Sequence, residues 1–118
     1  MRCLIPLLLC LATPLSAAEW ALRPGDQPFD AEDLAALPGQ VFRYYDDGES
    51  RFWANGAYAY TYSAQNGGGT AWGSYRVAED GSVCVTFTNG NKRCDLYVRD
   101  GNRTLLITEE GARFPMRP

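Results

Sequence analysis

The chain has 118 residues, of which 46% are hydrophobic and 13% aromatic, and its formal net charge is −3 at pH 7. This length predicts one small domain. The acidic balance excludes the basic surface that nucleic acid binding needs and would repel an anionic membrane, so neither is expected as a partner.

The first 18 residues, MRCLIPLLLCLATPLSAA, have the pattern of a secretory signal peptide. Their apolar stretch is shorter than the ~20 residues of a membrane span, and prolines interrupt it. We therefore expect an exported protein, in the bacterial periplasm, that does not span the membrane. A lipid anchor at Cys10 is not expected, because the apolar stretch before it is about six residues and the usual length is about 7–15.

Residues 19–29 are rich in proline and glycine and show no hydrophobic period, so they predict an extended N-terminal arm. Residues 30–37 predict a short helix that Asp30 caps and that Pro38 helps to end. A helix of about two turns is not stable alone. We expect it to plug one end of a single domain over 30–118, or to cover an edge strand.

From Gln40 onwards hydrophobicity alternates with a period of two, and turn dipeptides follow at regular intervals. Asn-Gly and Asp-Gly pairs are strong hairpin signals, because primed turns need positive φ. The predicted strands are 40–46, 49–54, 57–63, 70–78, 82–88, 92–99, 103–109 and 112–116. Such short connections require antiparallel pairing. The fold class is therefore mainly β, an eight-stranded antiparallel meander that closes or nearly closes into a small, filled up-and-down barrel.

Cys84 and Cys94 lie in the strands that flank a turn at 88–90. If Phe87 pairs with Asn91, the two cysteines lie directly opposite each other. An oxidising compartment and an even cysteine count then favour a structural disulfide, which should stabilise the domain by roughly 2–3 kcal/mol. Redox and metal sites are weaker interpretations, because the pair is not a C-x-x-C motif and the chain has no histidine.

Tyrosines at alternate positions of AYAYTY share one face of a strand, and tryptophans in the neighbouring strands share a face with arginines. Such side chains could form a concave surface that stacks on sugars or contacts a protein. They could instead fill the core, and the period of two favours this interpretation. The intervening alanines would then face solvent. The candidate ligand or partner contacts are Arg51, Trp53, Tyr58, Tyr60, Tyr62, Trp72 and Arg76.

Because histidine is absent, Ser-His-Asp and Cys-His catalysis and histidine-ligated metals are excluded. The other strand-region carboxylates lie at predicted hairpin ends, where turn geometry explains them, and only Asp95 lies in mid-strand. For Asp95 we expect a cross-strand salt bridge with Arg76 or Arg99. No carboxylate pair stands out as that of a hydrolase. We therefore predict no enzymatic activity, no cofactor and no metal.

Four segments carry a likeness to known proteins: DAEDLAAL, RYYDDGESRF, GSYRVAEDGSVCVTF and RCDLYV. Together they resemble a family of small exported bacterial proteins of unknown function, over roughly residues 30–114. The resemblance implies a periplasmic, calycin-like β-domain with a Cys84–Cys94 bridge and with Gly73 and Tyr75 as structural positions. Tyr75 stands where the family pattern leads us to expect tryptophan.

The expected function is that of a non-enzymatic periplasmic domain that binds an unidentified ligand or protein. One alternative is a proteinaceous inhibitor or an envelope-assembly partner, with residues 64–70 as the protruding contact loop. The other is a carboxylate-based hydrolase, which would need two acidic groups in one cleft.

Overall fold

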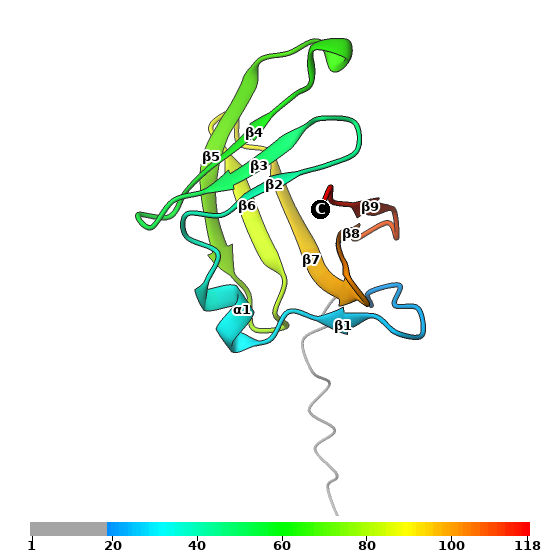
Figure 1. The fold of residues 1–118 in the computed structure, drawn as a ribbon. Coiled ribbons are helices and arrows are strands. Elements are labelled where there is room, and N and C mark those ends of the chain that lie inside the picture. Colours follow the sequence, from blue (N-terminus) through cyan, green and yellow to red (C-terminus); the bar gives the residue numbers. More distant parts are fainter. Residues whose placement is uncertain (1–18) are drawn as a thin grey trace, which may run out of the picture.

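The computed structural model describes residues 19–118, so the predicted signal peptide and Cys10 lie outside the described residues. Within that range nine strands form one antiparallel sheet, accompanied by one short α-helix (Figure 1). The strands are β1 (Gln27–Pro28), β2 (Val41–Arg43), β3 (Glu49–Phe52), β4 (Ala57–Thr61), β5 (Thr70–Val77), β6 (Val83–Phe87), β7 (Lys92–Asp100), β8 (Arg103–Thr108) and β9 (Arg113–Pro115). The helix is α1 (Ala31–Ala35), and a 3-10 turn, η1 (Ala64–Asn66), joins β4 to β5. No helix in this part of the chain is long and apolar enough to cross a membrane.

The eight strands from β2 to β9 confirm the predicted meander. Each lies within or one residue beyond its predicted segment, and each pairs antiparallel with its neighbours in the chain. The sheet curls into a half-barrel, so that its first and last strands approach each other. They meet at one bridge, Tyr44 with Met116, beside which the N–H of Arg117 donates to the Arg43 carbonyl at 2.7 Å.

The concave face of the sheet is filled by side chains, as predicted. The buried cluster consists of Phe29, Leu37, Tyr44, Phe52, Tyr58, Val83, Val85, Tyr97, Leu106 and Met116. Three hydroxyls inside it form a chain: the Ser50 hydroxyl lies 3.0 Å from the Tyr44 hydroxyl and 2.8 Å from that of Tyr58. The core therefore consists of packed aromatic and aliphatic side chains, and a short chain of hydrogen-bonded hydroxyls runs through it.

Gly73 and Tyr75 have structural roles in β5. Gly73 lies opposite Phe87 of β6, and a side chain there would overlap the carbonyl oxygen of Thr86. Because that atom is backbone, the two strands would have to separate, so only glycine fits. The Tyr75 hydroxyl donates to the carbonyl oxygen of Trp53 at 2.9 Å.

The N-terminal arm forms more structure than its sequence predicts. Its strand β1 pairs with β7 at Val98 and Arg99, beyond the point where β6 begins, so it completes a free edge of β7. The arm also covers a second, outer cluster formed by Leu96, Val98, Leu105 and Ile107, on which Trp20 packs. Asp26 then accepts two hydrogen bonds from Arg113 of β9, both at 2.8 Å. These contacts fasten the arm to the outside of the sheet.

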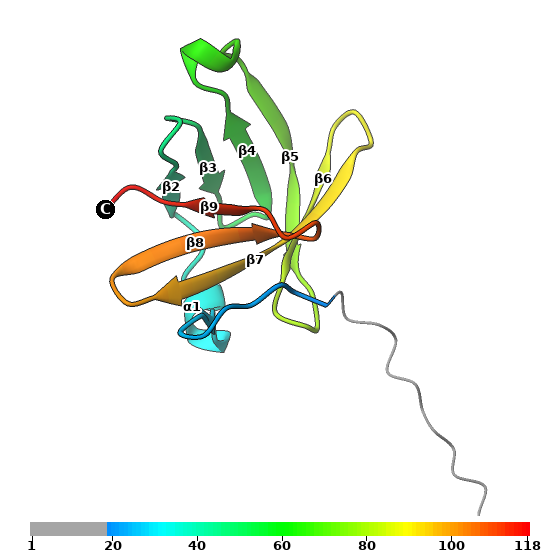
Figure 2. The same cartoon turned by 90° about the vertical axis from the view of Figure 1, so that its right-hand side faces the viewer.

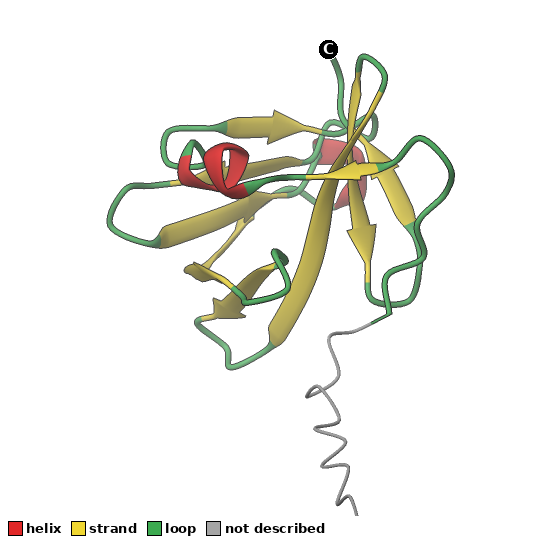
Figure 3. Ribbon diagram, turned by 90° about the horizontal axis from the view of Figure 1, so that it is seen from below, coloured by secondary structure: helices red, strands yellow, loops and turns green. Residues whose placement is uncertain are grey.

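Helix α1 closes one end of the half-barrel. Asp30 caps it and forms a reciprocal capping box with Asp33, which explains why so short a helix begins there. Leu34 packs against the core, and Leu37, two residues beyond the end of the helix, is fully buried. The segment is docked as predicted, although the helix is shorter than the predicted 30–37. Seen from below, α1 lies in front of the strands, at the end of the half-barrel nearer the viewer (Figure 3). The β4–β5 and β6–β7 hairpins project from the opposite end (Figure 2).

Candidate functional site

The predicted disulfide is present. Cys84 of β6 lies directly opposite Cys94 of β7, and an S–S bond of 2.06 Å joins them. The turn between the strands is also as predicted: Phe87 donates to the Asn91 carbonyl at 2.8 Å, and Gly90 has a φ of 90°. The disulfide thus fixes the hairpin whose tip forms one wall of the candidate site.

The candidate site lies at the open end of the half-barrel, opposite α1. Alternate turns of a meander lie at the same end of the sheet, so the β2–β3, β4–β5, β6–β7 and β8–β9 turns all gather here. Two cavities, of about 490 Å³ and about 180 Å³, lie between these turns. Tyr62 and Arg93 line both, so the cavities are contiguous. We call them the outer and inner cavities, and together the mouth.

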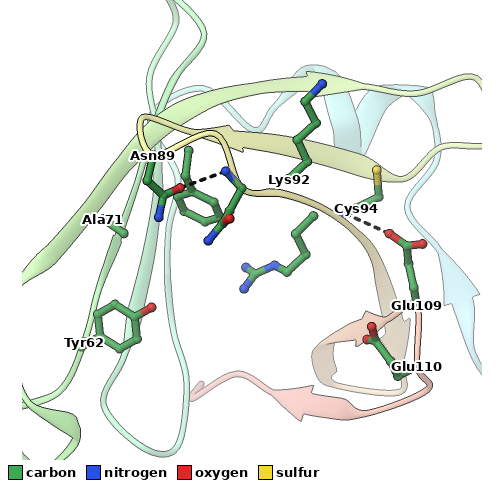
Figure 4. Close-up of a pocket in the computed structure, with 10 residues that line it drawn as sticks. Tyr62, Ala71, Asn89, Lys92, Cys94, Glu109 and Glu110 are labelled. Carbon is green, nitrogen blue, oxygen red and sulfur yellow. Dashed lines mark hydrogen bonds between the residues drawn. The ribbon is translucent and has the colours of Figure 1, made fainter.

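The outer cavity is polar and open. Figure 4 shows Tyr62 and Ala71 on one side, Glu109 and Glu110 on the other, and Asn89 on the hairpin between them. The remaining lining residues are Phe87, Asn91, Lys92, Arg93 and Cys94. Its volume falls in the ~300–1,000 Å³ range typical of small-molecule sites.

The inner cavity is smaller and has aromatic walls. Its lining consists of Tyr44, Asp46, Tyr60, Tyr62, Arg93, Leu106, Thr108 and Phe114. The rings of Tyr60 and Tyr62 meet edge to face at 4.9 Å, and Phe114 is 47% exposed. Burial raises the pKa of Tyr60, and the negative charge of Asp46 adds to the rise. Tyr60 therefore remains a neutral hydrogen-bonding group at physiological pH.

Arg93 is the cation that both cavities share. Its Nε donates to Asp95 Oδ2 at 2.7 Å, and its guanidinium lies 5.9 Å from the centre of the Phe87 ring. Neither of its Nη atoms makes a hydrogen bond to the described residues. The guanidinium is thus held at one nitrogen while its two terminal nitrogens remain available to a ligand.

Asp95 forms the salt bridge that fixes the position of Arg93. Its side chain is 2% exposed, and within residues 19–118 its Oδ1 has no hydrogen-bond partner. Burial raises the pKa of this carboxyl, although the nearby charge of Arg93 opposes the shift. The expected salt bridge with Arg76 or Arg99 is wrong. Arg76 lies opposite Cys84 on the outer face, and Arg99 pairs with Asp33 at 2.6 Å.

The tyrosine stripe runs from the core to the mouth. Tyr58 is fully buried, Tyr60 is partly buried at the inner cavity, and Tyr62 is 46% exposed at the rim. One stripe therefore supplies both core packing and a wall of the cavity.

The other predicted contacts lie on the opposite, outer face. Trp53 and Trp72 stack at 5.6 Å, with Arg51 over Trp53 and Trp72 52% exposed. Arg76 is exposed further along β5. Ala59, between Arg51 and Trp72 in the ladder, is only 4% exposed, so the expectation that the alanines face solvent is wrong at this position. The seven predicted contacts thus occupy two faces and do not form one concave patch.

Sequence reasoning missed most of the mouth. Arg93, Asp46, Phe87 and Phe114 were not among the predicted contacts, although each lies beside a turn at the open end. The order of the turns could have predicted this grouping. In a meander every second turn lies at the same end of the sheet, so residues beside alternate turns come together.

Among the described residues, no group of three or more histidine, cysteine or acidic side chains is placed to hold a metal ion. Comparison of the chain with protein-family models, with curated proteins and with solved structures finds no match.

Proposed function

We propose that this protein is an exported, non-enzymatic binding domain that takes a small ligand in the mouth of its half-barrel. The observation that carries the proposal is Arg93, which Asp95 fixes in a cavity of ligand size with aromatic walls. Sites of this kind combine apolar walls with a few well-placed polar groups. The predicted signal peptide and the disulfide support export to an oxidising compartment.

Two carboxylates of the mouth have structural partners, which favours a binding role for them over a hydrolytic one. Asp46 Oδ1 accepts a hydrogen bond from the N–H of Gly48 at 2.8 Å, and Glu109 Oε1 accepts one from the N–H of Cys94 at 3.3 Å. Both groups therefore hold the turns that shape the mouth. Asp95 is buried against Arg93, where it positions the cation.

The test is a binding screen with matched variants. The probes are a set of amino acids, cell-wall sugars and fatty acids, each tested by saturation-transfer NMR and then by calorimetry. Replacing both Tyr62 and Phe114 with alanine should weaken the binding of any hit by about tenfold or more, because both rings lose their apolar contact with it. Both side chains are about half exposed, so the variant should still fold.

Trp72→Ala is the matched control, because Trp72 is similarly exposed but lies on the outer face. It should leave the affinity unchanged. If no probe binds, or if Trp72→Ala abolishes binding while the mouth variant keeps it, the proposal is wrong. The second result would instead favour a partner surface around the Trp53–Trp72 stack.

A further inference from the structure

The inner cavity contains two opposite charges that do not neutralise each other. Within residues 19–118, Asp46 and Arg93 are the only charged side chains in its lining. No salt bridge joins these two described residues, and Arg93 is paired at its Nε with Asp95. A cavity of about 180 Å³ therefore offers a cation and an anion to the same small ligand.

Asp46 is an exposed residue whose carboxylate accepts two hydrogen bonds. Its Oδ1 accepts the Gly48 N–H, and its Oδ2 accepts a hydrogen bond from the side-chain amide of Asn66 at 3.3 Å. A side chain at Gly48 would overlap the Tyr60 hydroxyl and approach Asp46 Oδ1 to 3.1 Å. Glycine thus lets the Tyr60 hydroxyl pack against the turn that carries Asp46.

The chemistry of the lining indicates which ligand groups Arg93 and Asp46 would each accept. The fork of an arginine binds a carboxylate through two parallel hydrogen bonds. A carboxylate beside the faces of aromatic rings favours an ammonium group, through both charge and cation–π attraction. A ligand that lacks the ammonium would leave Asp46 without a cation, and one that lacks the carboxylate would leave the two Nη atoms of Arg93 without an acceptor, each at a cost in affinity. A ligand with both charges pairs each of them.

The two cavity sizes limit the ligand further. The inner cavity is smaller than a typical drug-sized site, so it accommodates one amino-acid-sized unit. The contiguous outer cavity carries two asparagines, Asn89 and Asn91, which can bond to amide groups, and it carries charges of both signs.

We propose that the mouth recognises a free amino acid, a small zwitterion, with its carboxylate on Arg93 and its ammonium at Asp46. This proposal rests on the function proposed above and names its ligand class. No bond is made or broken, and the ligand is held reversibly between two fixed charges.

Calorimetry with three probes of matched shape tests this proposal. Leucine carries both charges, 4-methylpentanoate lacks the ammonium, and 3-methylbutylamine lacks the carboxylate. Leucine should bind at least about tenfold more tightly than either analogue, because each hydrogen bond to a charged group contributes to affinity. Asp46→Asn should weaken leucine about tenfold and should not weaken 4-methylpentanoate, which has no ammonium for Asp46 to pair. Arg93→Lys, which keeps a cation beside Asp95, should weaken leucine and leave 3-methylbutylamine unchanged.

Asp47→Asn is the matched control. Asp47 is adjacent in sequence, but it pairs with Arg117 and does not line the cavity, so leucine affinity should not change. If leucine binds no more tightly than its analogues, or does not bind, the zwitterion proposal is overturned. The mouth would still be a binding site if another probe of the screen binds there and is weakened by the Tyr62 and Phe114 replacements, so the two failures are distinguishable.

Discussion

Replacing Arg113 with methionine is expected to lower the free energy of unfolding by about 2–3 kcal/mol, because it leaves the Asp26 carboxylate shielded from water without its cation. The Asp26 side chain is fully buried and that of Arg113 is 10% exposed. Two parallel hydrogen bonds join them and fasten the arm to β9. Urea unfolding at neutral pH measures the loss. Arg103→Met is the control and should cost little, because Arg103 is exposed and lies 3.9 Å from its partner Asp100.

The same ion pair predicts a pH dependence. Hydrogen bonds from Arg113 lower the pKa of Asp26 to about 2, from an ordinary value of 3.8. Because the folded pKa is the lower one, the unfolded state binds the proton first, and the stabilisation is complete above about pH 4. It is lost as the pH falls towards about 2. The stability difference between wild type and Arg113→Met should therefore shrink over this range, and a constant difference would contradict the role given to the pair.

Replacing both Cys84 and Cys94 with alanine removes the disulfide and should also lower the free energy of unfolding strongly. We expect a loss of about 2–3 kcal/mol, because the bridge closes a short loop and restricts the unfolded chain. The two cysteines are separated by 10 residues. Denaturation of the purified, oxidised protein, with and without reductant, measures the change. Reductant should lower the midpoint of the wild type to that of the double variant.

Reductant should leave the double variant unaffected, which controls for its general effects. Free thiols in the untreated wild type, or a midpoint that reductant does not move, would contradict the assignment. The disulfide also borders the mouth, since the N–H of Cys94 donates to Glu109 and Arg93 precedes it in β7. The reduced protein should therefore bind ligand more weakly even where it remains folded.

The strands and the disulfide could be predicted because their signals are local. The turn dipeptides fixed the hairpin registers, and the β6–β7 register alone placed Cys84 opposite Cys94. The N-cap at Asp30 is equally local. Strand β1 could not be predicted, because its proline-rich sequence becomes a strand only where β7 offers it a free edge.

The site was harder to predict because it depends on how the sheet closes. Tyr44 and Phe114 come together only when β2 reaches β9, and no local pattern predicts that contact. Other features were available in the sequence. Arg93 and Asp95 are two residues apart in one strand and therefore share a face. The same rule separates Trp53 from the tyrosine stripe, because its neighbour Phe52 pairs with Tyr58.

Backbone NMR during titration with the tightest-binding probe measures most directly where the ligand sits. If the mouth is the site, the largest amide shifts will fall at its turns, in residues 44–48, 60–62, 87–94 and 106–114. Shifts concentrated around Trp53 and Trp72, with these turns unchanged, would contradict the account.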